Sequence, residues 1–205
     1  MRFLVLFACF AAWLNAEIID RLVITVDRHA ITEQQLDEEL RVTAFLNGEP
    51  VVRSRQTLHD AADRMIEQLL ILREMEMSHY PMPNRGEVSQ YLEQLQSRFA
   101  GSADFEKRLE TYALSDDILR DHLAQQIVTL RFVDYRFRSG LSISDAEIEA
   151  RYHAESGTQG TTVPEAAKES IRQELIGQRT DEALDRWLQE ARRHVKIVYL
   201  EPSLQ

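Results

Sequence analysis

The sequence is poor in the residues that build covalent cross-links and tight binding loops. It has one cysteine, seven glycines and five prolines among 205 residues. The single cysteine, Cys9, lies in an apolar stretch near the N-terminus. One thiol forms no internal disulfide and supplies no cluster of thiolate ligands. We therefore expect burial of apolar side chains to hold the fold together.

Sequence motifs of well-characterised catalytic sites are also missing. There is no Gly-x-Ser-x-Gly segment, no phosphate-binding loop and no dinucleotide-binding fingerprint. None of the six histidines is three or four residues from another, so no helix carries a metal-binding histidine pair. Acidic pairs such as Glu38-Glu39 and Asp116-Asp117 fit solvated helix faces or helix N-termini. The sequence predicts no catalytic residue, no metal site and no cofactor.

The charge balance disfavours two classes of partner. The chain has 34 acidic residues against 24 lysines and arginines, a formal net charge of −10. Nucleic acids and anionic membrane surfaces both select for clustered basic side chains. We expect no nucleic-acid partner, and an acidic surface that keeps the protein from aggregating.

The first residues have the pattern of a secretory signal peptide. Arg2 is followed by the apolar segment Phe3–Leu14 and then by Asn15-Ala16. We predict a signal peptide at residues 1–16, with cleavage after Ala16 that removes Cys9. A lipoprotein signal ending at Cys9 is the alternative. The apolar run is shorter than the roughly 20 residues that span a bilayer, so we expect export without stable membrane insertion.

Two short β-branched segments bracket a chain that otherwise has helical periodicity. Leu22–Val26 and Lys196–Leu200 are strand-like, and an isolated strand leaves backbone groups unpaired. We expect the two to pair with each other, with Asp27–Ala30 as a turn. The fold class predicted is mainly α, a multi-helix body with a small two-stranded β ribbon formed by the N- and C-terminal strands.

Capping signals mark where the helices begin. Thr32, Asn84 and Ser144 each precede a Gln or Glu at the third following position, which is the pattern of a capping box. Ser102 and Ser115 open two more helices, and Pro164 opens the last one, which runs to about His194. The helix from about Arg55 to His79 has the widest apolar face, so we expect it to be central.

Methionines and aromatic residues near the end of that helix are the candidate binding surface. Met77 and Met82 fit an exposed apolar patch, because methionine adapts to varied partners. Tyr80, Tyr91 and Phe99 would extend this patch, and each also fits a core position. We treat these five residues as the predicted client-binding set.

The order of elements resembles the SurA-type periplasmic chaperones and the related N-terminal region of PpiD-type foldases. The resemblance is carried by four segments: Leu22–Glu33, Ala61–Met75, Ser142–Tyr152 and Ile171–Tyr199. In relatives with prolyl-isomerase activity, a parvulin domain of about 100 residues lies between the last two segments. Here residues 155–163 form only a short linker there, too short to fold alone.

The resemblance implies a periplasmic, non-enzymatic chaperone domain at residues 17–205. It would act as an ATP-independent holdase whose partners are unfolded or extended envelope and outer-membrane proteins. Three alternatives remain open from the sequence: a folding factor related to prolyl isomerases, an envelope assembly subunit with one fixed partner, and a helical exported domain without clients. The sequence does not define the oligomeric state.

Overall fold

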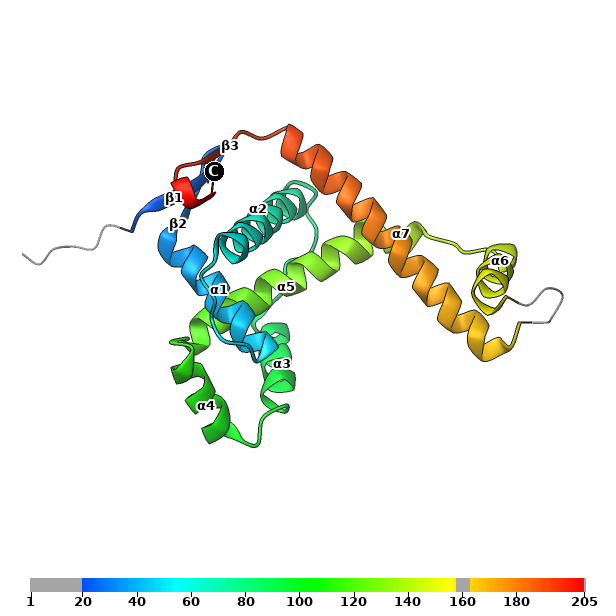
Figure 1. Ribbon diagram of the computed structural model, residues 1–205, viewed down its shortest axis with the longest axis horizontal. Coiled ribbons are helices and arrows are strands. Elements are labelled where there is room, and N and C mark those ends of the chain that lie inside the picture. Colours follow the sequence, from blue (N-terminus) through cyan, green and yellow to red (C-terminus); the bar gives the residue numbers. More distant parts are fainter. Residues whose placement is uncertain (1–19, 158–162, 205) are drawn as a thin grey trace, which may run out of the picture.

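The computed structural model describes residues 20–157 and 163–204, so the predicted signal peptide and Cys9 lie outside the described residues. Within this part the chain has seven α-helices and three strands, and the mainly α fold is confirmed (Figure 1). The elements in chain order are β1 Leu22–Val26, β2 His29–Thr32, α1 Glu33–Asn47, α2 Arg55–Met77, α3 Arg85–Gln96, α4 Ser102–Thr111, α5 Asp116–Arg136, α6 Asp145–Ser156, α7 Glu165–Arg193 and β3 Ile197–Tyr199.

The two ends of the described chain meet in one antiparallel sheet. Strand β1 is its centre and pairs with both β2 and β3, giving the order β2-β1-β3. Ile24 lies opposite Tyr199, and Val26 lies opposite Ile197. The predicted pairing of the two terminal strands is confirmed.

The sheet has a third strand, β2, whose first two residues, His29 and Ala30, were predicted to belong to a turn. The turn is shorter than the predicted Asp27–Ala30, because only Asp27 and Arg28 connect β1 to β2. Asp27 has a φ of 52°, a left-handed conformation that aspartate adopts more readily than most residues. Its carboxylate accepts hydrogen bonds from the Lys196 amide (2.8 Å) and the Arg73 guanidinium (2.9 Å), which hold the pKa of Asp27 below its ordinary value. The hairpin turn is therefore tied to β3 and to α2.

Side-chain hydrogen bonds cap the predicted helix starts at Thr32, Asn84, Ser115 and Ser144, whereas α4, which begins at Ser102, and α7, which follows Pro164, begin without one. Capping boxes are formed by Thr32, Asn84 and Ser144, and Ser54 forms a further one at the start of α2. Gly48 ends α1 with a φ of 69°, a conformation that glycine adopts without steric cost. Backbone groups that helix ends leave unpaired are thus satisfied locally.

Helix α2 lies at the centre of the body and contributes to two of its three apolar clusters. Its residues Ala62 and Ile66 pack with the sheet and α1, and Ile71 and Met75 pack with α5 and α7. Met75 is fully buried. The third cluster joins α1, α3, α4 and α5 around the rings of Phe45 and Phe105. The prediction of a central α2 agrees with this arrangement.

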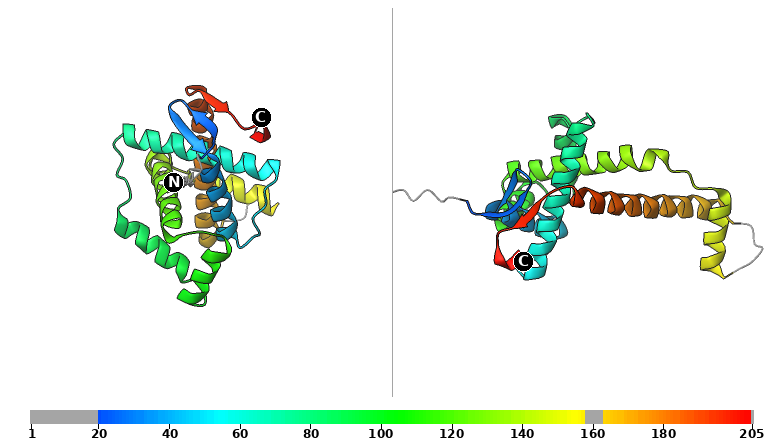
Figure 2. Two further views of the ribbon diagram at one scale, coloured as in Figure 1. Left: turned by 90° about the vertical axis from the view of Figure 1, so that its left-hand side faces the viewer. Right: turned by 90° about the horizontal axis from the view of Figure 1, so that it is seen from above.

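Helix α6 and the first half of α7 project away from the sheet, and α6 lies at the far end of α7 (Figures 1 and 2). Few apolar side chains hold this end together: Ile148, Val163 and Ile171 are buried there. Ion pairs Arg151–Glu174 and Arg179–Glu147 also join the two helices.

The predicted linker at residues 155–163 is only partly a linker in the structure. Helix α6 continues through Ser156, and Val163 is a buried residue. Gly157 caps α6 in a left-handed conformation, with a φ of 65°. Residues 158–162 lie outside the described part of the chain.

After β3 the chain makes a short 3₁₀ helix, Pro202–Leu204, which was not predicted. Leu204 is 1% exposed and packs in the cluster between the sheet, α1 and α2. The C-terminal segment thus completes the core rather than merely covering the sheet.

We predict that Leu204→Ala lowers the free energy of unfolding by about 2–5 kcal/mol, because it leaves a cavity at a fully buried site. Urea denaturation measures this value. Leu200→Ala is the matched control: Leu200 is 47% exposed, and its change should stay within about 0.5 kcal/mol. Equal effects of the two substitutions would contradict the burial of Leu204.

Candidate functional site

Several hollows with partly apolar linings open beside α2 in the described part of the chain, and the three with the largest volumes lie on different sides of the helix. The largest, about 580 Å³, lies between β2, α2 and α5. A second of about 430 Å³ lies between α2, α5 and α7, and a third of about 280 Å³ between α2 and α7. Residues of α2 that line them follow helical spacing, so neighbouring elements surround α2 without filling all the space around it.

We call the largest hollow the β2 groove. Its apolar side chains include Met65, Leu69 and Leu72 from α2 and Val128 from α5. Met82, in the loop after α2, lines the same space. A lining that is mostly apolar with a few polar groups is typical of binding sites.

Polar side chains of the β2 groove come from three helices and β2. Gln35, Gln68 and Gln125 line it together with Asp121 and His29. A smaller hollow of about 180 Å³ beside α1 shares the three glutamines and Asp121 with it, so the two form one continuous surface. Amide side chains supply both donors and acceptors, which suits contact with a polypeptide backbone.

A buried ionic cluster lies beneath this surface. The Glu39 carboxylate, 6% exposed, accepts a hydrogen bond from Arg64 Nε at 2.9 Å and lies 3.3 Å from His122 Nδ1. Burial alone would raise the pKa of Glu39, but the contacts with His122 and Arg64 outweigh it, so the pKa lies below its ordinary value. Because Glu39 is on α1, Arg64 on α2 and His122 on α5, the cluster fixes three helices that border the groove.

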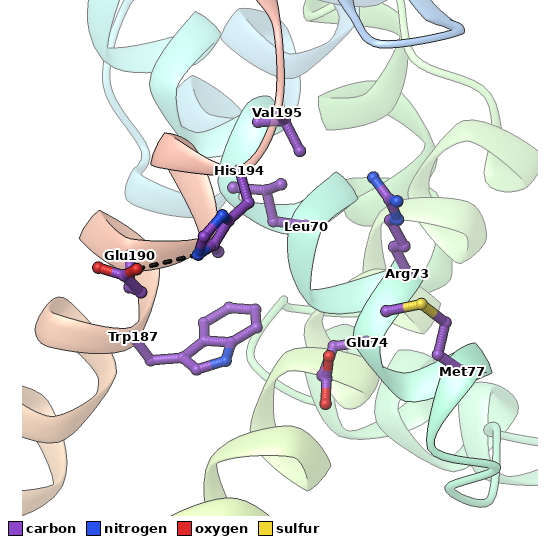
Figure 3. A pocket seen from close by; sticks show the side chains of 9 residues that line it. Leu70, Arg73, Glu74, Met77, Trp187, Glu190, His194 and Val195 are labelled. Atoms are coloured by element: carbon purple, nitrogen blue, oxygen red, sulfur yellow. Dashed lines mark hydrogen bonds and ion pairs between the residues drawn. The ribbon is translucent and has the colours of Figure 1, made fainter.

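The hollow between α2 and α7 is shown in Figure 3. Trp187 of α7 points toward α2, and Met77 lies across the space from it. Leu70 adds a further apolar side chain. The His194 ring lines the same hollow, and its Nε2 lies 2.9 Å from Glu190 Oε1. This hollow therefore offers an aromatic ring and a thioether at one opening.

The structure does not bring the five predicted client-binding residues together. Met77 (58% exposed) and Met82 (43% exposed) lie at different hollows. Tyr80 stacks on Tyr135 with ring centroids 5.4 Å apart. Tyr91 is exposed on α3 and lines none of the hollows described above.

Phe99 has the core role that the sequence left open. Its ring lies 5.8 Å from Phe45 and 5.2 Å from Phe105, centroid to centroid, and it is partly buried. The predicted single patch is therefore two separate methionine-bordered hollows, with the aromatic members placed elsewhere.

Sequence reasoning missed two features of these surfaces. Leu130 continues the helical spacing of Leu123 and Ile127, yet its side chain is half exposed at the hollow between α2, α5 and α7. The strand β2, which borders the largest groove, was not predicted, and its first two residues were assigned to a turn. Its β-branched pair Ile31-Thr32 was a signal for a strand, but two residues are too few to indicate one alone.

The described residues contain no group of three or more histidine, cysteine or acidic side chains that could hold a metal ion. Among the helices described, none is long and apolar enough to cross a membrane.

We predict that Glu39→Gln lowers the free energy of unfolding by about 1–3 kcal/mol at neutral pH, because it leaves Arg64 and His122 without their carboxylate. Glu38→Gln changes the neighbouring residue, whose carboxylate accepts a hydrogen bond from Gln34 and has no basic partner among the described residues; it is the control and should change stability little.

The difference between wild type and Glu39→Gln should also depend on pH. Since the folded protein lowers the pKa of Glu39, the stabilisation is complete above the ordinary carboxyl pKa and is lost as pH falls through the lowered value. Urea denaturation from pH 7 to pH 3 measures this difference. A difference that grows toward acid would contradict the assignment.

Comparison with models of known protein families gave no match for this chain, and no curated protein matched it.

Proposed function

We propose that the protein is an ATP-independent holdase that binds extended segments of unfolded polypeptides in the hollows around α2. The observation that carries this proposal is the presence of three partly apolar hollows, two of them bordered by the exposed methionines Met77 and Met82. Exposed large apolar side chains at a concave surface favour an interaction role over a purely structural one.

The chemistry of the hollows suits varied clients. Methionine is unbranched and polarizable, so Met77 and Met82 can contact side chains of different shapes. Volumes of about 280–580 Å³ accommodate a few client side chains each. Occupancy of several weak sites by one extended chain raises the total affinity through effective concentration.

The resemblance to SurA-type chaperones supports the same function and adds a location. On this basis we propose a periplasmic protein whose clients are unfolded envelope or outer-membrane proteins. We also propose a chaperone domain without isomerase activity, because only residues 155–163 lie where such relatives have a catalytic domain of roughly 100 residues.

We predict that the purified protein suppresses aggregation of a urea-unfolded outer-membrane β-barrel protein diluted into buffer, followed by light scattering. The double variant Met77→Gln/Met82→Gln should need about threefold more protein for half suppression, because two apolar contacts are lost. Tyr91→Gln removes an exposed apolar side chain away from the hollows and should leave suppression unchanged.

Absence of suppression at any ratio would contradict the holdase function. Co-purification of one stoichiometric partner that blocks suppression would instead favour the dedicated assembly subunit.

A second prediction concerns isomerase activity. The protein should not accelerate cis–trans isomerisation of a proline-containing peptide. The uncatalysed reaction takes roughly tens to hundreds of seconds at about 25 °C. A protease-free fluorescence assay measures this rate. Clear catalysis at micromolar protein would show that the chain has an active site that the proposal denies.

A further inference from the structure

We propose that the β2 groove binds an extended polypeptide by adding it as a strand to the free edge of β2, with preference for segments that place a Lys or Arg beside apolar residues. This proposal rests on the holdase function and names the binding mode and the class of client segment. It uses three observations: a strand edge that no other described strand pairs with, a partly apolar groove beside that edge, and a lining that, together with the adjoining small hollow, has acidic side chains but no Lys or Arg.

The hydrogen bonds around β1 show which backbone groups of β2 point away from the sheet. Asp27 N donates to Lys196 O at 2.9 Å, and Leu200 N donates to Val23 O at 2.8 Å. Odd-numbered residues of β1 therefore bond toward β3, and the even-numbered residues Ile24 and Val26 bond toward β2.

The register then determines where the backbone N–H and C=O of Ala30 point. His29 lies opposite Val26 and Ile31 opposite Ile24, so both bond to β1, while Ala30 lies opposite Thr25. In an antiparallel pair such a residue directs its N–H and C=O away from its partner strand. Ala30 thus offers one donor and one acceptor at the outer edge of β2, and Ala30 also lines the β2 groove.

An added strand would lie along a surface that accepts its side chains. Alternate residues of a strand point to opposite faces. Those facing the protein would meet Leu69, Leu72 and Met82, while Gln68 and Gln125 can bond polar groups of the client. Main-chain bonds supply sequence-tolerant affinity, and the groove supplies selection among side chains.

The charges that line the groove favour a cationic client residue. No Lys or Arg lines the β2 groove or the smaller hollow continuous with it. Among the described residues, neither Asp121 nor Glu38 forms an ion pair with a basic side chain, whereas Glu39 is already paired with Arg64. The overall charge of −10 adds to this preference and disfavours a second copy of the chain as the occupant.

The test uses labelled nine-residue peptides that alternate valine and threonine around a central Lys, or around a central Glu. Fluorescence anisotropy with the full-length protein should show about fivefold tighter binding of the Lys peptide, as expected for one exposed charge pair. In about 1 M salt the Debye length falls to about 3 Å, and the preference should disappear.

Asp121→Asn should reduce the preference for Lys to less than about twofold. Asp185→Asn is the matched control, because Asp185 is an exposed aspartate on α7 that has no basic partner within the described part of the chain and lines none of the hollows named above. It makes the same change in net charge and should keep the fivefold preference.

Strand addition is tested separately on the peptide and on the protein. N-methylation of alternate peptide residues can be placed on the odd or on the even positions. One of the two sets should weaken binding about tenfold and the other little, because only one set of amides faces β2. Ala30→Pro removes the outward N–H of β2 and should weaken all peptides, provided that circular dichroism shows a folded protein. The methylated peptides decide the question if this variant does not fold.

Equal binding of the Lys and Glu peptides, equal effects of both methylation registers, or no binding of any peptide would overturn this proposal. A dimer that Ala30→Pro dissociates would also overturn it, since a second copy would then occupy the edge. If the wild-type protein still suppresses aggregation when one of these results is found, strand addition is wrong but the holdase function is not. If the wild-type protein does not suppress aggregation, the holdase function itself is contradicted.

Discussion

The rest of the structure depends on burial of α2 from several sides. Helix α2 has apolar residues on most of its circumference, and no single neighbour can cover them. The sheet and Leu204 cover Ile66 and Leu70, and α5 and α7 cover Ile71 and Met75. Because apolar burial is the main favourable term in folding, elements distant in sequence are drawn to this helix.

The same constraint accounts for the hollows. Helices and a three-stranded sheet that meet one central helix cannot fill all the space around it, and gaps remain where α2 faces two neighbours at once. Polar contacts then hold the borders of these gaps. The Glu39–Arg64–His122 cluster ties α1, α2 and α5, and Arg192 of α7 pairs with Asp63 and Glu67 of α2. The proposed binding surface thus results mainly from how the helices and the sheet pack, and Met82 of the loop after α2 adds to it.

Local features were predictable from the sequence, and long-range ones only in part. The capping boxes at Thr32, Asn84 and Ser144 depend on residues three positions apart, so the sequence alone defines them. The terminal strands were predictable because an unpaired strand needs a partner and each end of the chain had one candidate. Strand β2 was not, since four residues show too little alternation to distinguish a strand from a turn.

The candidate site was less predictable than the fold. Residues near each other in sequence, such as Met77 and Met82, lie at different hollows because the chain turns around the end of α2 between them. Phe99 joined an aromatic cluster whose other members, Phe45 and Phe105, come from α1 and α4. Within residues 20–157 and 163–204, no strand pairs with the outer edge of β2 and no basic side chain pairs with Asp121; both features follow from tertiary structure, which no local pattern contains.

The most direct test of the account is amide hydrogen exchange of the protein with and without a bound unfolded β-barrel client. The account predicts added protection at Ala30 and its neighbours in β2, together with the segments of α2 and α5 that line the β2 groove. Protection confined to α6 and the first half of α7, or no change in any region while the client is bound, would contradict it.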